Sequence, residues 1–195
     1  MLRYLPVMRH TYCSDVRISV LPGVVEGIGS AGDVKVAIKD EDGGLLPSAI
    51  PDVSIIKDCS YSESGLDDAE EAVDILALLK HKLLASPLSG FVLEGASPYG
   101  RSVSMSRARA LSVATFSGLP VVQTGRGNTT GFAEGSSTII AGSNLTSTKA
   151  RLLLMLCIMK FGMLPKAQDP TRPTREEVKT IERRVSLYQD IFDRH

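Results

Sequence analysis

The sequence predicts an α/β domain of three layers, in which helices cover both faces of a mostly parallel sheet. From Asp52 onward, short apolar runs alternate with longer segments of helical periodicity. The runs Val53–Lys57, Phe91–Leu93 and Leu119–Thr124 are largely apolar and lack the strict alternation of strands that face water on one side. Strands buried on both faces have this character, and their alternation with helices is typical of parallel sheets.

The composition indicates a globular protein that needs no metal or disulfide to form a core. The 195 residues are 43% hydrophobic, and a formal net charge of zero disfavours nucleic acid and anionic membranes as partners. Three cysteines stand far apart and no Cys or His spacing suits a metal, so we expect reduced thiols, a cytoplasmic location and no cofactor. The apolar run Leu152–Met159 is too short to span a bilayer.

The first fifty residues are expected to form a separate segment before the main sheet. Val16–Val20 and Val34–Lys39 are predicted strands, which together suggest a small antiparallel pair. Gly27–Gly32 lies between them and is interpreted as flexible punctuation, because glycines recur there. The turn Asp40–Gly44 follows the second strand.

Side chains that can cap helices mark the helices of the main domain. Asp67 can serve as an N-cap, and Glu70 three residues later completes a capping box. Thr146 is expected to cap a later helix, although Ser147 and the two residues after it supply no acid for a capping box. The predicted helices cover residues 67–85, 104–117 and 146–161, and a further strand covers residues 138–141.

A final amphipathic helix is predicted beyond a linker at residues 166–173. Thr174 and Glu177 form a capping box at its start, directly after Pro173. An apolar stripe runs along the helix and must be covered by something. We favour a homodimer contact for this stripe, with packing against its own domain as the rival. The stripe consists of Val178, Ile181, Val185, Tyr188 and Phe192.

Several segments together resemble the small C-terminal domain of the L-asparaginase family. Gly118–Gly162 resembles the strand, exposed loop and capped helix that close that domain, and Pro51–Ile56 resembles the strand that opens it. Gly90–Gly95 resembles its second strand, and Arg9-His10-Thr11 resembles the end of the large N-terminal domain. The resemblance implies a flavodoxin-like domain at residues 51–165. Residues 1–50 would then be a linker remnant, and residues 166–195 a linker with an extra helix.

The departures from that family concern its chemistry. The family's nucleophilic threonine lies in an N-terminal Thr-Gly-Gly-Thr-Ile segment, and neither this segment nor a second Thr-Asp-Lys set is found in this sequence. The family's Gly-x-Gly-Asn motif appears here as Gly95–Arg101, without the asparagine. The resemblance therefore implies the C-terminal-domain part or subunit of an amidohydrolase that is inactive as an asparaginase by itself, with the N-terminal domain supplied as a separate chain or cut away.

Two other functions remain open from the sequence. One is a free-standing domain used as a small-molecule enzyme in a biosynthetic pathway, and the other is a noncatalytic binding or assembly domain. An enzyme predicts a closed pocket lined by Glu94, Tyr99, Arg101 and Arg126, whereas a missing N-terminal domain predicts exposed apolar surface around residues 1–12. In each case we expect a homo-oligomer, and for an enzyme a small ligand that carries a carboxylate or an amide.

The candidate site residues lie in loops that follow the strands, because parallel sheets bind ligands at the carboxyl ends of their strands. Glu94 is either a general acid or base or one half of a structural ion pair with arginine. Arg101 and Arg126 either clamp a carboxylate or are solvated loop arginines, and Cys59 is a candidate thiolate. The remaining substrate-binding candidates are Tyr99, which could cover a pocket, Asn128, and Glu134, which is a loose counterpart of the family's loop acid.

Overall fold

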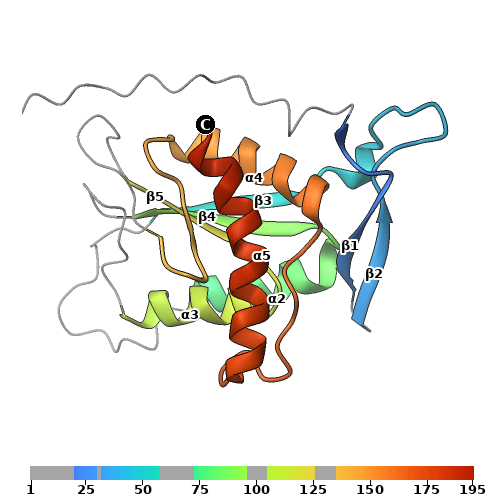
Figure 1. Ribbon diagram of the computed structural model, residues 1–195. Coiled ribbons are helices and arrows are strands. Elements are labelled where there is room, and N and C mark those ends of the chain that lie inside the picture. Colours follow the sequence, from blue (N-terminus) through green and yellow to red (C-terminus); the bar gives the residue numbers. More distant parts are fainter. Residues whose placement is uncertain (1–19, 30–31, 58–72, 96–104, 126–134) are drawn as a thin grey trace, which may run out of the picture.

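A computed structural model describes residues 20–29, 32–57, 73–95, 105–125 and 135–195 of the chain. Its main sheet has four parallel strands in chain order: β3 (Asp52–Lys57), β4 (Ser89–Gly95), β5 (Val121–Gly125) and β6 (Ile140–Ala141). Helices α2 (Val73–Ala85) and α3 (Met105–Phe116) cover one face, and α4 (Ser147–Phe161) covers the other (Figure 1). The predicted three-layer, flavodoxin-like class is therefore confirmed.

The middle strands are buried because helices press on both of their faces. Six of the seven residues of β4 are buried, and Gly90 lies against α4 so closely that an added Cβ would sit 3.2 Å from side-chain atoms of Leu154 and Ile158. Both crossover helices lie on the same face, as right-handed parallel connections require. The core is thus continuous from α2 and α3 through the sheet to α4.

The antiparallel pair before the sheet exists, but its first strand is not the predicted Val16–Val20, of which residues 16–19 lie outside the described residues. The pair consists of β1 (Val24–Gly29) and β2 (Gly32–Ala37), so the supposed flexible glycines belong to strands: Gly27 and Gly29 lie in β1, and Gly32 opens β2. The Ile28 N–H donates to the Pro87 carbonyl at 2.8 Å, and a Cβ on Gly27 would lie 2.7 Å from that same oxygen. Glycine at position 27 therefore permits close packing of a strand.

The helix starts were predicted well where the structure describes them. Thr146 caps α4 by accepting from the Lys149 N–H, and Thr174 with Glu177 forms the capping box of α5 (Arg175–Asp193). The backbone N–H groups of Gln168 and Thr174 donate to the Glu177 carboxylate. These two hydrogen bonds above all lower the pKa of the Glu177 carboxyl. The predicted start of the first helix, with its capping box at Asp67, lies outside the described residues.

The stripe of the terminal helix packs against its own domain, which corrects the favoured expectation of a homodimer contact. Helix α5 crosses α4 and lies along β6 (Figure 1). Tyr188 and Phe192 are fully buried, and Ile181 and Val185 nearly so. The Tyr188 hydroxyl donates to the Gly162 carbonyl, and the Arg184 guanidinium donates to the Phe161 carbonyl at 2.8 Å. Helix α5 therefore satisfies the carbonyls at the C-terminus of α4 and belongs to the domain's core.

The edge of the sheet at β6 is closed by one side chain of α5. The Gln189 amide accepts from the Ala141 N–H at 2.8 Å and donates to the Ala141 carbonyl at 3.3 Å. A further β-strand would offer the same pair of contacts to the edge. The terminal helix thereby replaces a fifth strand at this end of the sheet.

Candidate functional site

Three strands end side by side at the edge where the sequence places the site. Lys57 of β3, Glu94 of β4 and Thr124 of β5 are neighbours in register. Glu94 is the candidate site residue that the structure describes. The other candidates lie outside the described residues, namely Cys59, Tyr99, Arg101, Arg126, Asn128 and Glu134. The described strands follow chain order, so no reversal of strand order marks a crevice among them.

Glu94 is held by the first turn of α4. The Ser147 hydroxyl donates to Glu94 Oε2 at 2.6 Å, and both side chains are half-buried. Ser147 is the first residue of α4, whose first turn contains no acid. The N-terminus of a helix is a favourable place for a carboxylate, because its unpaired N–H groups carry partial positive charge. Glu94 therefore supplies from β4 the negative charge that α4 lacks in its own sequence.

Ser147 is the partner of the candidate residue Glu94 that sequence reasoning missed. It lies 53 residues from Glu94 in the chain, so no local pattern connects the two. The indirect signal was the absence of an acid in the first turn after Thr146. Such a turn can accept a carboxylate from another element.

The Thr124 side chain makes a structural hydrogen bond between two strands and is not exposed for a reaction. Its side chain is fully buried, and its hydroxyl donates to the Leu93 carbonyl of the neighbouring strand at 3.0 Å. A nucleophilic hydroxyl must be exposed to substrate and must lie beside a base. Thr124 is therefore not placed to serve as a nucleophile.

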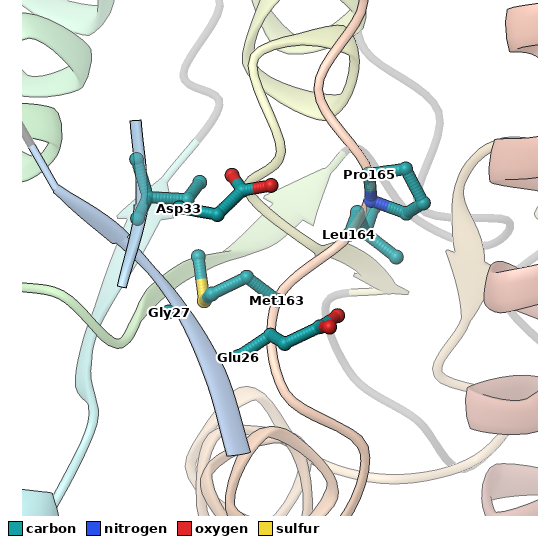
Figure 2. A pocket seen from close by; sticks show the side chains of 7 residues that line it. Glu26, Gly27, Asp33, Met163, Leu164 and Pro165 are labelled. Atoms are coloured by element: carbon teal, nitrogen blue, oxygen red, sulfur yellow. The ribbon is translucent and has the colours of Figure 1, made fainter. Parts of the chain in front are cut away.

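Two cavities in the described part of the chain lie away from Glu94. One, of about 90 Å³, lies between β1, β2 and the segment after α4, and Figure 2 shows Glu26 and Asp33 on either side of Met163. The other, of about 280 Å³, lies between the Ser136–Ser137 turn and α5. Both are smaller than the ~300–1,000 Å³ of ordinary small-molecule sites.

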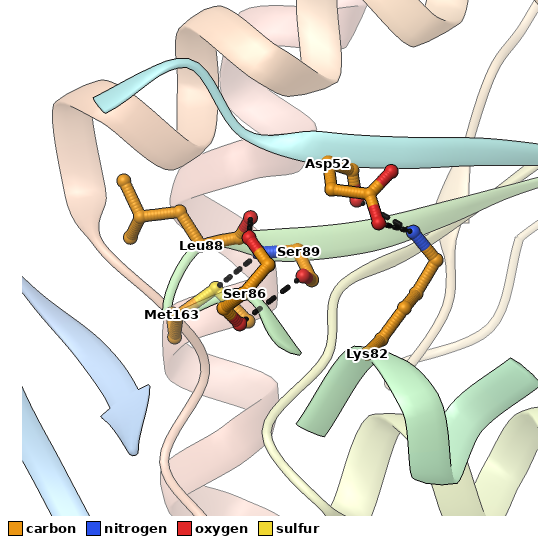
Figure 3. Close-up of polar contacts among 6 residues, drawn as sticks. All are labelled: Asp52, Lys82, Ser86, Leu88, Ser89 and Met163. Atoms are coloured by element: carbon orange, nitrogen blue, oxygen red, sulfur yellow. Dashed lines mark hydrogen bonds and ion pairs between the residues drawn. The ribbon is translucent and has the colours of Figure 1, made fainter. Parts of the chain in front are cut away.

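A polar cluster near the amino-terminal ends of the strands joins α2, β3 and β4 (Figure 3). The Lys82 ammonium is buried, donates to the Asp52 carbonyl at 2.7 Å, and lies 2.8 Å from the Asp52 carboxylate. It also lies 5.3 Å from the centre of the Phe91 ring. Burial lowers the pKa of Lys82, and the bond with Asp52 opposes part of that shift. The cluster ties α2 to the starts of β3 and β4, so its role is structural.

The described residues provide neither a metal centre nor a membrane span. Across these ranges, no three His, Cys, Asp or Glu side chains gather closely enough to hold a metal ion. Among the helices described, none has the length and apolar character needed to cross a bilayer.

The architecture defined above is that of a three-layer α/β domain whose parallel sheet is flanked by a strand pair and a terminal helix. The crystal structure of a probable cytoplasmic L-asparaginase from Campylobacter jejuni is similar to it, with a TM-score of 0.50 and 24% sequence identity. The match covers 74% of this chain and 36% of that enzyme, so the chain corresponds to about a third of the enzyme's length. The predicted resemblance to an L-asparaginase is thus confirmed at the level of the fold.

Comparison of sequences adds no closer relationship. No protein-family model matches the chain, and no curated protein matches it.

Proposed function

We propose that the chain is the C-terminal-domain part of an asparaginase-like amidohydrolase acting on a small amide, and that it is inactive as an asparaginase by itself. The observation that carries the proposal is the similarity of its fold to about a third of an L-asparaginase. The printed 195 residues contain no Thr-Gly-Gly-Thr-Ile segment to supply the nucleophile. The domain then contributes substrate contacts to a site whose reactive threonine lies elsewhere.

Within that site, Glu94 acts as a hydrogen-bond acceptor. Its carboxylate faces the hydroxyl of Ser147 at the start of α4, and this arrangement suits a fixed negative charge. A fixed carboxylate at a sheet edge recognises the ammonium or amide N–H groups of a small amino-acid amide. Arg101 and Arg126 are proposed to bind the carboxylate of the same substrate, with Tyr99, Asn128 and Glu134 around it. Cys59 remains the candidate thiolate.

The purified chain is expected to release no ammonia from L-asparagine above a heat-killed control. The physical reason is the missing nucleophile, because a hydroxyl, a base and an oxyanion hole must meet for amide attack. Ammonia release is measured by a coupled assay, with the Glu94→Gln variant purified in parallel to exclude contaminants. Hydrolysis by the parent chain that disappears in Glu94→Gln would contradict the proposed inactivity.

Loss of either arginine is expected to weaken binding of an acidic ligand by about 1.5–3 kcal/mol, as for a hydrogen bond to a charged group. Titration calorimetry with L-aspartate compares Arg101→Ala and Arg126→Ala with the parent chain. Arg183→Ala is the matched control, because Arg183 is exposed on α5. Equal affinity in all four proteins would place the ligand away from these two loops.

A further inference from the structure

Among the described residues, the strand pair has one covered edge and one open edge. Glu26 and Ile28 of β1 turn their backbone groups away from β2: the Met163 N–H donates to the Glu26 carbonyl at 2.8 Å, and the Ile28 N–H donates to the Pro87 carbonyl at 2.8 Å. Beyond the ladder, the Ile38 N–H donates to the Gly23 carbonyl at 2.7 Å. These contacts fix which residues of the pair face inward.

In an antiparallel pair, successive residues direct their backbone groups alternately toward the partner strand and away from it, which identifies the groups on the outer edge of β2. Even-numbered residues of β2 exchange hydrogen bonds with β1, so Asp33, Lys35 and Ala37 direct their N–H and C=O groups outward. All three are exposed, and within the described ranges nothing is hydrogen-bonded to these outward groups. An edge of this kind is a template for another strand.

The side chains on this edge are complementary to a second copy of themselves. When two β2 strands pair antiparallel about a two-fold axis at Val34, Asp33 of each copy lies opposite Lys35 of the other. Moving the register by one hydrogen-bonded pair in either direction sets Lys35 against Lys35, or Asp33 against Asp33. Like charges directly opposite one another are destabilising, whereas opposite charges stabilise a strand pair. One register is therefore selected.

The rest of the strand pair supports the same register. Glu26 of β1 is the neighbour of Lys35 in the ladder, so Lys35 would lie between Glu26 of its own chain and Asp33 of the second copy. On the opposite face, Val34 is 39% exposed and would meet the Val34 of the second copy at the axis. A lone lysine on an edge strand repels another strand, but Asp33 and Lys35 together remove that protection.

We propose that the open edge of β2 is a self-association surface, through which two copies of this chain join their strand pairs into one four-stranded antiparallel sheet. Each copy donates and accepts backbone hydrogen bonds at Asp33 and Lys35. The contact is confined to one strand from each copy, which places it among small and weak interfaces. The surface is independent of the proposed amidohydrolase function. Helix α4, 15 residues and about 22 Å long, separates the Ser147 end beside Glu94 from the Gly162 end beside β1.

A charge exchange tests this surface in the full chain. Sedimentation equilibrium is measured between about 10 μM and about 1 mM, the range expected for a weak interface. Asp33→Lys and Lys35→Asp are each expected to raise the dimer dissociation constant at least about tenfold, because each sets like charges opposite one another twice. An equimolar mixture of the two variants restores both opposite-charge pairs, and we expect its dissociation constant to lie within about threefold of the parent chain's.

Two further proteins complete the test. The double variant Asp33→Lys/Lys35→Asp regains complementarity and is expected to dimerise like the parent chain. Glu41→Lys changes the charge of an exposed turn residue outside the strand pair and should leave dimerisation unchanged. Circular dichroism confirms that every variant is folded. A parent chain that is monomeric throughout the range overturns the proposal. So does a dimer that Asp33→Lys does not weaken, or a mixture that associates no better than its two components.

Discussion

Replacing Tyr188 by alanine is expected to lower the free energy of unfolding by about 4 kcal/mol, as for other large aromatic side chains removed from a core. Tyr188 is fully buried, and its ring centre lies 5.4 Å from that of Phe161 on α4. Its hydroxyl donates to the Gly162 carbonyl at the C-terminus of α4. The alanine variant leaves both a cavity and an unpaired carbonyl, so urea denaturation should show a much lower midpoint.

Tyr188→Phe is the matched control, because it keeps the ring and removes only the hydroxyl. Its expected cost is about 1–2 kcal/mol, the range for one hydrogen bond whose buried partner is left unsatisfied. A cost below 1 kcal/mol for Tyr188→Ala would show that α5 does not dock on α4 as described. In the same way, deletion of residues 174–195 should lower the free energy of unfolding further, because it uncovers the face of α4 and the edge of β6.

Tyr188→Phe and the parent chain are also expected to differ in the dependence of their stability on pH. Burial raises the pKa of Tyr188 well above its ordinary value, so the folded state disfavours the phenolate. In the unfolded chain Tyr188 loses its hydroxyl proton at a pH of about 10, before the folded chain does. The stability that the neutral Tyr188 hydroxyl provides is therefore lost as the pH rises above that value. Tyr188→Phe should therefore lose less stability than the parent chain between neutral pH and pH ~11.

Replacing Gly162 by alanine should cost about 3 kcal/mol, the sum of a left-handed backbone and a steric overlap. Gly162 ends α4 with a φ of 77°, which side chains rarely adopt. A Cβ at this position would lie 2.7 Å from the Glu26 carbonyl oxygen and 3.1 Å from the Glu26 nitrogen. Those atoms belong to the backbone of β1 and cannot rotate away, so the strand itself would have to move.

Gly43→Ala separates the two contributions. Gly43 has a φ of 81°, and nothing lies within 4 Å of a Cβ built there. We expect this variant to cost about 1 kcal/mol, from the backbone conformation alone. The difference between the two variants in urea denaturation measures the close approach of α4 to β1. Equal costs at positions 43 and 162 would mean that β1 can yield without loss.

The features predicted correctly from sequence are those that depend on neighbouring residues. The capping box of Thr174 and Glu177 was predicted because both partners lie within four residues. Gly27 was assigned to a flexible segment, because glycine by itself is as typical of a turn as of a close contact. Position 27 requires glycine because the Pro87 carbonyl, 60 positions further along the chain, packs against it. Local chemistry is readable from sequence, whereas contacts that pack distant elements are not.

The candidate site and the terminal helix show the same limit. The rule that parallel sheets bind at the carboxyl ends of their strands placed Glu94 at this edge, but its partner Ser147 lies on another element. The apolar stripe of α5 correctly predicted a covered face. An apolar stripe predicts that a helix face is buried, but it does not identify the partner that covers it. Tyr188 was therefore expected to contact a second copy of the chain, whereas it packs against α4.

The contact between Gln189 and Ala141 has a consequence for the order in which the domain folds. Strand β6 has two residues, and the outward groups of Ala141 are satisfied by a side chain 48 positions later in the chain. The strand is therefore incomplete until the terminal helix has docked, and the two elements should form and open together as a single cooperative unit. The amide proton of Ala141 would then exchange with solvent when α5 leaves, so one backbone position reports the undocking of a whole helix.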